Sequence, residues 1–263
     1  MNLNEVKYIK KDSFSEIAEF RNDYLDCTYD SQELYLELFC QKSKIYQLEL
    51  NQKVVGYFVL GNDSTIFEFY ILENWIQQND AIFKKVVQDF QIKKALSKSF
   101  DFNMMACCLG IQKRTKVIGV LFREKKNSAI AIDDSDIKIR LAETADISLI
   151  KEVNEDVFET EEEINWAIEN QGLFIFEKNA EFLGLGLCNR TVEGRPDFDI
   201  GMLVDRKFRG RGYGKYIINY LYEYCRQNGW RGTCGCAIEN IASRKCLESA
   251  GFIGRHRMIE FEF

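Results

Sequence analysis

A glycine-rich loop late in the chain joins an alternating apolar segment, residues 197–204, to a long helical pattern that includes Ile217 and Leu221. The loop reads Arg209-Gly210-Arg211-Gly212-Tyr213-Gly214. Glycines permit positive φ and let the backbone approach a ligand closely, and the following helix begins with unsatisfied N–H groups. A strand, a tight loop and a helix in this order are typical of α/β folds, and such a loop is suited to bind phosphate.

The second half of the chain reads as a complete α/β unit around this loop. Strands are expected at residues 137–141, 173–177, 181–188, 197–204, 233–238 and near the end of 252–263. Helices are expected at 146–158, with Asp146 as N-cap, and at 161–170, 214–228 and 240–250. This mixed order favours a sheet with helices on its faces over a bundle or a sandwich.

The first half of the chain repeats this order. Strands are expected at residues 6–10, 45–50, 53–60, 65–72, 95–100 and 115–123, and helices at 13–25, 80–90 and 102–110. Asn51 precedes Gly56 by the same spacing at which Asn179 precedes Gly184. The repeated order predicts two copies of one fold. Residues 73–80 stand in place of the glycine loop in the first copy, so we expect a single phosphate site, in the second copy. The predicted domains are 1–128 and 137–263, with a linker at 129–136.

Composition narrows the classes of function. A net charge of −6 and a pI near 5.2 argue against nucleic acid as a partner. No long apolar run and no secretory signal are present, which predicts a cytoplasmic protein without membrane contact. The nine cysteines are odd in number and irregularly spaced, and there is one histidine, so we expect reduced thiols and no metal site.

The loop resembles the Arg/Gln-x-x-Gly-x-Gly/Ala signature of the GNAT superfamily of acetyl-CoA-dependent N-acetyltransferases. A second motif agrees with it: Asn240-Ile241-Ala242-Ser243, followed by Gly251-Phe252, looks like the family's Asn-x-x-Ser helix that ends in Gly-Phe. The resemblance covers residues 137–263. It implies an α/β (α+β) fold of two GNAT-like domains, each a mixed, mostly antiparallel sheet with helices on both faces, the first domain being degenerate.

The resemblance implies acetyl-CoA as the acyl donor. The backbone of Leu203 and Val204 is expected to hydrogen-bond the pantetheine arm, as an added strand would. The pyrophosphate is expected to be held by Arg209, Gly210, Arg211, Gly212, Tyr213, Gly214 and Lys215. Asn240 and Ser243 are further candidates for cofactor contacts, although Asn240 is equally suited to cap its own helix.

The catalytic residues are less clear from the resemblance. The family's tyrosine acid, seven residues after the motif asparagine, falls on Leu247, which cannot donate a proton; Cys246 and Tyr213 are weak substitutes. The glutamate that several members carry before the loop falls on Phe198. The neighbouring Asp199 is therefore the best candidate for the general base, against a purely structural role at the strand end.

The predicted activity is transfer of an acetyl group from acetyl-CoA to a primary amine of a small molecule or a protein, by direct attack in a ternary complex. The alternative is a sensor or scaffold that binds acetyl-CoA or CoA without turnover, which the leucine at position 247 would allow. The first domain would shape the acceptor site or a homodimer interface, or bind a regulatory ligand of its own.

Overall fold

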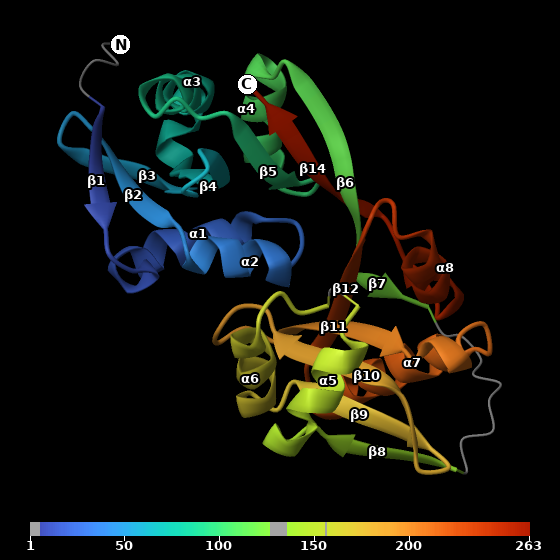
Figure 1. The fold of residues 1–263 in the computed structure, drawn as a ribbon. Coiled ribbons are helices and arrows are strands. Elements are labelled where there is room, and N and C mark those ends of the chain that lie inside the picture. Colours follow the sequence, from blue (N-terminus) through green and yellow to red (C-terminus); the bar gives the residue numbers. More distant parts are fainter. Residues whose placement is uncertain (1–5, 127–135, 156) are drawn as a thin grey trace. The chain divides into compact units, whose positions relative to one another are not determined.

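The computed structural model describes residues 6–126, 136–155 and 157–263, which form two compact units (Figure 1). Unit 1 contains Met1–Val120, Ala237–Glu239 and His256–Phe263, and unit 2 contains Leu121–Cys236 and Asn240–Arg255. The units therefore differ from the contiguous segments 1–128 and 137–263, because each includes short pieces from the other half of the chain. The expected linker at 129–136 lies, apart from Asp136, outside the described residues.

The sheet of unit 1 has the strand order β1-β2-β3-β4-β5-β14. Its strands are β1 (Lys7–Lys11), β2 (Lys44–Leu50), β3 (Lys53–Leu60), β4 (Thr65–Ile71), β5 (Lys94–Lys98) and β14 (His256–Glu262). Neighbouring strands are antiparallel except β4 and β5, which are parallel. The last strand of the chain completes this sheet by pairing with β5, which explains why residues 256–263 belong to unit 1. The strand β6 (Arg114–Phe122) follows the last helix of this unit.

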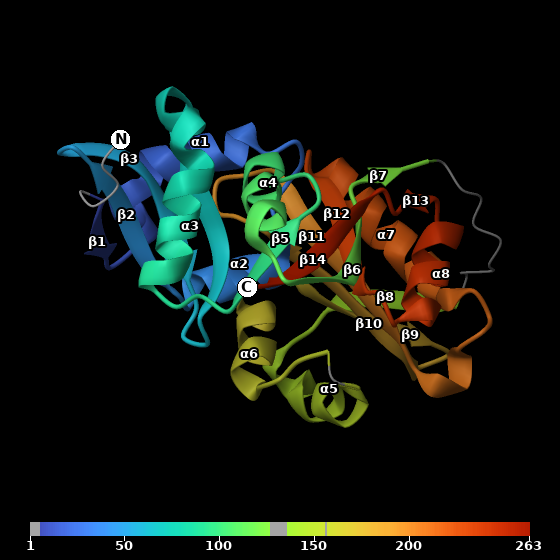
Figure 2. The same ribbon diagram turned by 90° about the horizontal axis from the view of Figure 1, so that it is seen from above.

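The helices of unit 1 are α1 (Ala18–Cys27), α2 (Leu34–Gln41), α3 (Asn79–Asp89) and α4 (Phe102–Ile111). Helices α3 and α4 lie side by side (Figure 2) and contribute to a core with Phe58, Phe69, Phe83 and Met104. Sequence reasoning missed α2, because most of its eight residues, Leu-Tyr-Leu-Glu-Leu-Phe-Cys-Gln, are apolar, and so short an apolar run does not show a helical period.

The sheet of unit 2 has the order β8-β9-β10-β11-β12, which repeats the order of β1 to β5. Its strands are β8 (Ile137–Leu141), β9 (Leu173–Lys178), β10 (Glu181–Arg190), β11 (Asp197–Val204) and β12 (Arg231–Ala237). Again the neighbours described are antiparallel except the final pair, β11 and β12. A second small sheet joins β7 (Glu124–Lys125) to β13 (Phe252–Ile253).

Helices cover both faces of the sheet of unit 2, as the sequence predicts. They are α5 (Ile147–Val153), α6 (Glu161–Glu169), α7 (Tyr213–Gln227) and α8 (Ile241–Ser249). Helix α7 lies so close to β10 that a Cβ on Gly186 would stand 3.1 Å from Leu221. On the other face, Ile150 of α5 and Ile164 of α6 pack with Leu185.

The two units repeat local details as well as strand order. Gly56 pairs with Ile71 in unit 1, and Gly184 pairs with Val204 in unit 2. A Cβ on Gly56 would stand 1.9 Å from a carbonyl oxygen of β4, and one on Gly184 would stand 2.3 Å from a carbonyl oxygen of β11. In both copies, the close approach of the neighbouring strand requires a residue without a side chain at this position. This gives a physical reason for the equal spacing between asparagine and glycine in the two halves of the sequence.

The helix expected at residues 146–158 is shorter than predicted and ends at Val153. Just after this end, the side chain of Asn154 accepts from the N–H of Phe158 and donates to its C=O, each at 2.7 Å. Asp146 makes no N-cap bond to α5. Its carboxylate accepts instead from the backbone N–H of Glu143 at 2.8 Å and from the guanidinium of Arg140.

Candidate functional site

Strands β11 and β12 separate partway along their length. They pair over Asp197–Asp199 and Arg231–Thr233, and both continue beyond that point, β11 to Val204. On the other edge of β11, the N–H of Asp205 donates to a carbonyl of β10. Backbone groups alternate between the two edges of a strand, so the N–H and C=O of Met202 and Val204, rather than those of Leu203, point into the gap.

The glycine loop follows this open strand end and begins α7. Gly210 has φ 74° and Gly212 has φ 89°, a backbone region in which a side chain costs energy. Gly212 is the N-cap of α7, so the N–H groups of Tyr213, Gly214 and Lys215 lie in the first turn, where they have no partner within the helix. N–H groups and a helix dipole in this arrangement attract anions, and they lie where the sequence predicts the phosphate site.

Helix α8 borders the gap on its other side. The side-chain oxygen of Asn240 accepts from the N–H of Ser243 at 3.0 Å and caps this helix. The capping role expected for Asn240 is therefore confirmed, and its cofactor contact stays a prediction. Cys246 also belongs to α8, and burial raises the pKa of its thiol.

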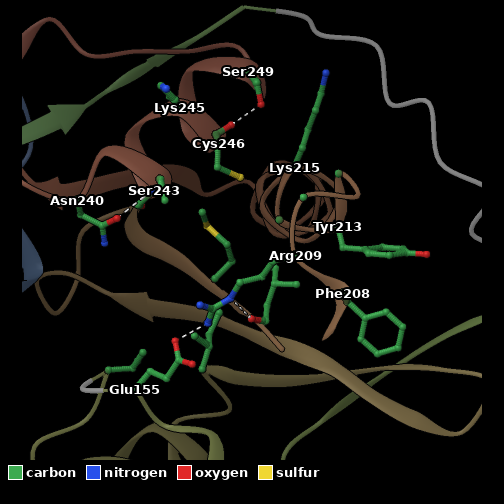
Figure 3. Close-up of a pocket in the computed structure, with 18 residues that line it drawn as sticks. Glu155, Phe208, Arg209, Tyr213, Lys215, Asn240, Ser243, Lys245, Cys246 and Ser249 are labelled. Atoms are coloured by element: carbon green, nitrogen blue, oxygen red, sulfur yellow. Dashed lines mark hydrogen bonds and ion pairs between the residues drawn. The ribbon is translucent and has the colours of Figure 1, made fainter. Parts of the chain in front are cut away.

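These elements surround one cleft of ≈ 730 Å³ within unit 2. Its volume falls in the range of sites for small molecules and cofactors. Figure 3 shows the side chains around it, with Glu155 and Arg209 facing each other. The cleft is lined by Glu155, Val157, Met202, Leu203, Val204, Phe208, Arg209, Gly210, Gly212, Tyr213, Gly214, Lys215, Asn240, Ala242, Ser243, Lys245, Cys246 and Ser249.

The lining brings together most of the residues predicted for the cofactor. Leu203, Val204, Asn240, Ser243 and the loop from Arg209 to Lys215 all take part, except Arg211. Among the described lining residues, the cations are Arg209, Lys215 and Lys245, and the carboxylate is that of Glu155. The charge of the lining is therefore complementary to a ligand with several negative charges.

Asp199, the predicted base, lies at the last paired position before the gap. It stands opposite Asn189 on β10 and beside Thr233 on β12. It does not line the cleft as formed by the described residues, and it is three residues from Met202, about 10 Å along the strand. The neighbouring Asp197 is ion-paired with Arg231, which gives that carboxylate a structural role.

Leu247, at the family's tyrosine position, is buried on α8 and is 1% exposed. It therefore contributes to the core and supplies no proton. The described part of the chain contains no group of three or more His, Cys, Asp or Glu side chains that could hold a metal, and all nine cysteines are free thiols.

The corresponding place in unit 1 is built differently. A 3₁₀ helix, Glu73–Gln78, precedes α3 where unit 2 has the glycine loop. Strand β4 carries Glu68, which is fully buried and accepts hydrogen bonds from Arg21, Gln32 and Tyr57. Unit 1 therefore lacks the loop that offers N–H groups to a phosphate, and polar side chains that bind one another are buried beside β4.

A sheet that opens at its parallel pair, beside a glycine loop and a cationic cleft, is typical of α+β domains that bind a phosphate-bearing cofactor. Comparison with known proteins identifies the family. Residues 13–125 match the model of the acetyltransferase (GNAT) domain, and residues 140–252 match that of the acetyltransferase (GNAT) family. The chain belongs to the GNAT acetyltransferases and carries two of their domains in tandem. No curated protein sequence matches the chain significantly.

Solved structures share this fold over nearly the whole chain. An acetyltransferase of the GNAT family from Colwellia psychrerythraea has 21% identity and a TM-score of 0.88, over 98% of this chain and 99% of that one. A tandem GNAT protein from the clavulanic acid biosynthesis pathway has 10% identity and a TM-score of 0.60, over 98% of both chains. A GCN5-related N-acetyltransferase from Sphaerobacter thermophilus has 11% identity and a TM-score of 0.63, over 97% of this chain and 95% of that one.

Sequence reasoning missed several lining residues, of which Glu155 is the most informative. It belongs to the loop between α5 and α6 and reaches the cleft from about fifty residues before the glycine loop. A lone glutamate in a polar loop gives no signal of this contact, because only the tertiary fold brings the loop to Arg209. Met202 was also missed, although alternation along β11 could have identified it.

Proposed function

We propose that the protein transfers an acetyl group from acetyl-CoA to a primary amine of a small molecule or a protein. The observation that carries this proposal is the position of the gap between β11 and β12, which opens directly onto the start of α7 within one cleft. An extended amide-containing ligand can pair with the open strand edge while its phosphates reach the helix N-terminus. Acetyl-CoA joins a pantetheine arm to a pyrophosphate in this way.

The residues of the cleft fit the two parts of this donor. The N–H and C=O of Val204 are suited to the pantetheine amides, and those of Met202 lie one step further into the gap. An N–H at this place would stabilise negative charge on the thioester oxygen during attack. The first-turn N–H groups of α7, with Lys215 and Lys245, are suited to the phosphates.

We propose Asp199 as the general base. It would take a proton from the ammonium of the acceptor, directly or through water, and the amine nitrogen would then attack the thioester carbon. The new C–N bond forms as the C–S bond breaks, and the electron pair leaves with the CoA sulfur. A thiol with a pKa of about 8.5 departs as thiolate without a strong acid, so the buried Leu247 is compatible with turnover.

The alternative function is a sensor or scaffold that binds acetyl-CoA or CoA without turnover. The observation that favours it is the distance of Asp199 from the cleft together with the leucine at position 247. In both cases we expect a cytoplasmic protein without nucleic-acid or membrane partners. Within the described residues, no helix has the length and apolar character needed to cross a bilayer.

Incubation with acetyl-CoA, a thiol-reactive dye and a panel of amines tests the two functions. Amine-dependent release of CoA thiol supports the transferase, and tight binding of CoA without release on any amine supports the sensor.

Asp199→Asn should lower kcat at neutral pH by about 100-fold while the Kd for CoA is unchanged. Asp197→Asn is the control, since that carboxylate is already paired with Arg231 and its loss should affect stability rather than rate. Unchanged turnover in Asp199→Asn would place the base elsewhere.

A further inference from the structure

The carboxylate of Glu155 binds two arginines of the segment that leads into α7. One oxygen accepts from Nε of Arg206 at 2.5 Å, and the other is paired with the guanidinium of Arg209. Hydrogen bonds from these two side chains, that of Arg209 first, lower the pKa of Glu155, so the group is an anion at neutral pH. Glu155 thus gives Arg209 a negative partner at the same cleft in which the phosphates of a cofactor would lie.

Arg209 makes a second contact that bears on ligand binding. Its Nε donates to the carbonyl oxygen of Val204 at 2.9 Å. That carbonyl points into the gap between β11 and β12, where the amide of an added strand would bind. In this arrangement Arg209 therefore occupies a backbone acceptor of the cofactor site, and Glu155 holds it there.

Glu155 itself has a strained backbone conformation. Glu155 has φ 41°, in the left-handed region that costs a residue with a side chain about 1 kcal/mol. A strained backbone persists where its surroundings determine it, and here the side chain of Asn154 binds the backbone of Phe158 at both its N–H and its C=O. The carboxylate is therefore held by a residue whose backbone strain persists beside the contact between Asn154 and Phe158.

From these contacts we propose that Glu155 is an autoinhibitory anion of the cofactor cleft. In the ligand-free protein its carboxylate holds Arg209 against Val204, and binding of CoA replaces this carboxylate with phosphate and releases the carbonyl. The proposal rests on the proposed function, because it takes CoA as the ligand. A fraction of the protein molecules is in this closed arrangement. The apparent affinity for CoA is therefore lower than the affinity of the open cleft.

Glu155→Gln tests the proposal by removing the charge while keeping the size of the side chain. The apparent Kd for CoA, measured by calorimetry on the full chain, should fall by about three- to tenfold. Added sodium chloride weakens the internal ion pair in the wild type as well as the contacts to phosphate. The Kd of the wild type should therefore rise less steeply with salt than that of Glu155→Gln.

Glu181→Gln is the matched control. Glu181 pairs with Lys207 of the same segment at 2.9 Å, both side chains are exposed, and Glu181 does not line the cleft. Its substitution should leave the Kd for CoA unchanged. Wild type that binds CoA, with Glu155→Gln binding equally or more weakly, overturns the inhibitory role and leaves the proposed function intact. Absence of CoA binding in both proteins, with melting curves that show both folded, overturns the proposed function and with it this inference.

Discussion

The Sγ atom of Cys246 lies 2.8 Å from the point at which a side chain on Gly214 would begin. This close approach lies between the first turn of α7 and helix α8, the two elements that flank the cleft. Gly214 has no positive φ, and alanine is a better helix former, so the approach to Cys246 gives a packing reason for glycine at this position.

Gly214→Ala should destabilise unit 2 by about 1–3 kcal/mol through overpacking and weaken CoA binding. Cys246→Ala removes the obstructing sulfur, so the double variant should recover most of the loss. Thermal melting and CoA calorimetry on the four members of this cycle measure the coupling. Gly110→Ala is the control: nothing lies within 4 Å of a Cβ at Gly110 in α4, and this change should be neutral or stabilising. If the effects of the two single substitutions simply add in the double variant, the contact between Gly214 and Cys246 does not cause the loss.

Gly212→Ala should reduce CoA affinity at least tenfold, because φ 89° at the N-cap of α7 presents the first-turn N–H groups to the ligand. The backbone strain of an alanine there is about 1–2 kcal/mol. Gly194→Ala separates strain from binding, since Gly194 also has positive φ, at 77°, and lies in open space away from the cleft. Both variants should lose similar stability, and only Gly212→Ala should lose affinity. Equal CoA binding by both would refute the phosphate site.

The sequence was most informative where one local rule decided the structure. The glycines of the loop, the Asn179 turn and the period of α7 each needed few residues, and the structure has these elements close to their predicted bounds. The exchange of β14 into unit 1 could not be read in this way, because its residues alternate equally well beside either sheet. The same limit hid Glu155, whose role depends on a contact with a distant loop.

Asn240→Ala should cost about 1 kcal/mol of stability, since it removes the oxygen that caps α8. Asn240→Asp keeps a capping oxygen and adds a negative charge at the cleft. If Asn240 also contacts the cofactor, the aspartate variant should melt like the wild type and yet bind CoA several-fold more weakly. Unaltered affinity in Asn240→Asp would restrict this residue to its capping role. Melting curves and calorimetry separate these outcomes.

Glu68→Ala should destabilise unit 1 by about 3–5 kcal/mol, because it leaves the buried guanidinium of Arg21 with one carboxylate partner in place of two. Glu260→Ala, which breaks an ion pair with the partly exposed Lys94, should cost less than about 1 kcal/mol. Urea unfolding followed by circular dichroism compares the two. Similar losses in the free energy of unfolding would show that the buried cluster of unit 1 stabilises the fold no more than a surface ion pair does.

Asp146 should make unit 2 sensitive to acid. Its carboxylate binds both terminal nitrogens of Arg140, at 2.6 and 2.7 Å, and these bonds lower its pKa in the folded protein. A group whose folded pKa lies below its unfolded value stabilises the fold above that unfolded value, about 3.9 for aspartate, and loses this contribution as the pH falls through the folded pKa. The wild type should therefore lose stability below about pH 4 more steeply than Asp146→Asn, which has no proton to gain.

Glu161→Gln, in the exposed pair with Lys151, is the control and should follow the wild type. Melting temperatures between neutral and acidic pH measure the slopes, and parallel curves for wild type and Asp146→Asn would show that the Arg140 contact does not stabilise the folded state.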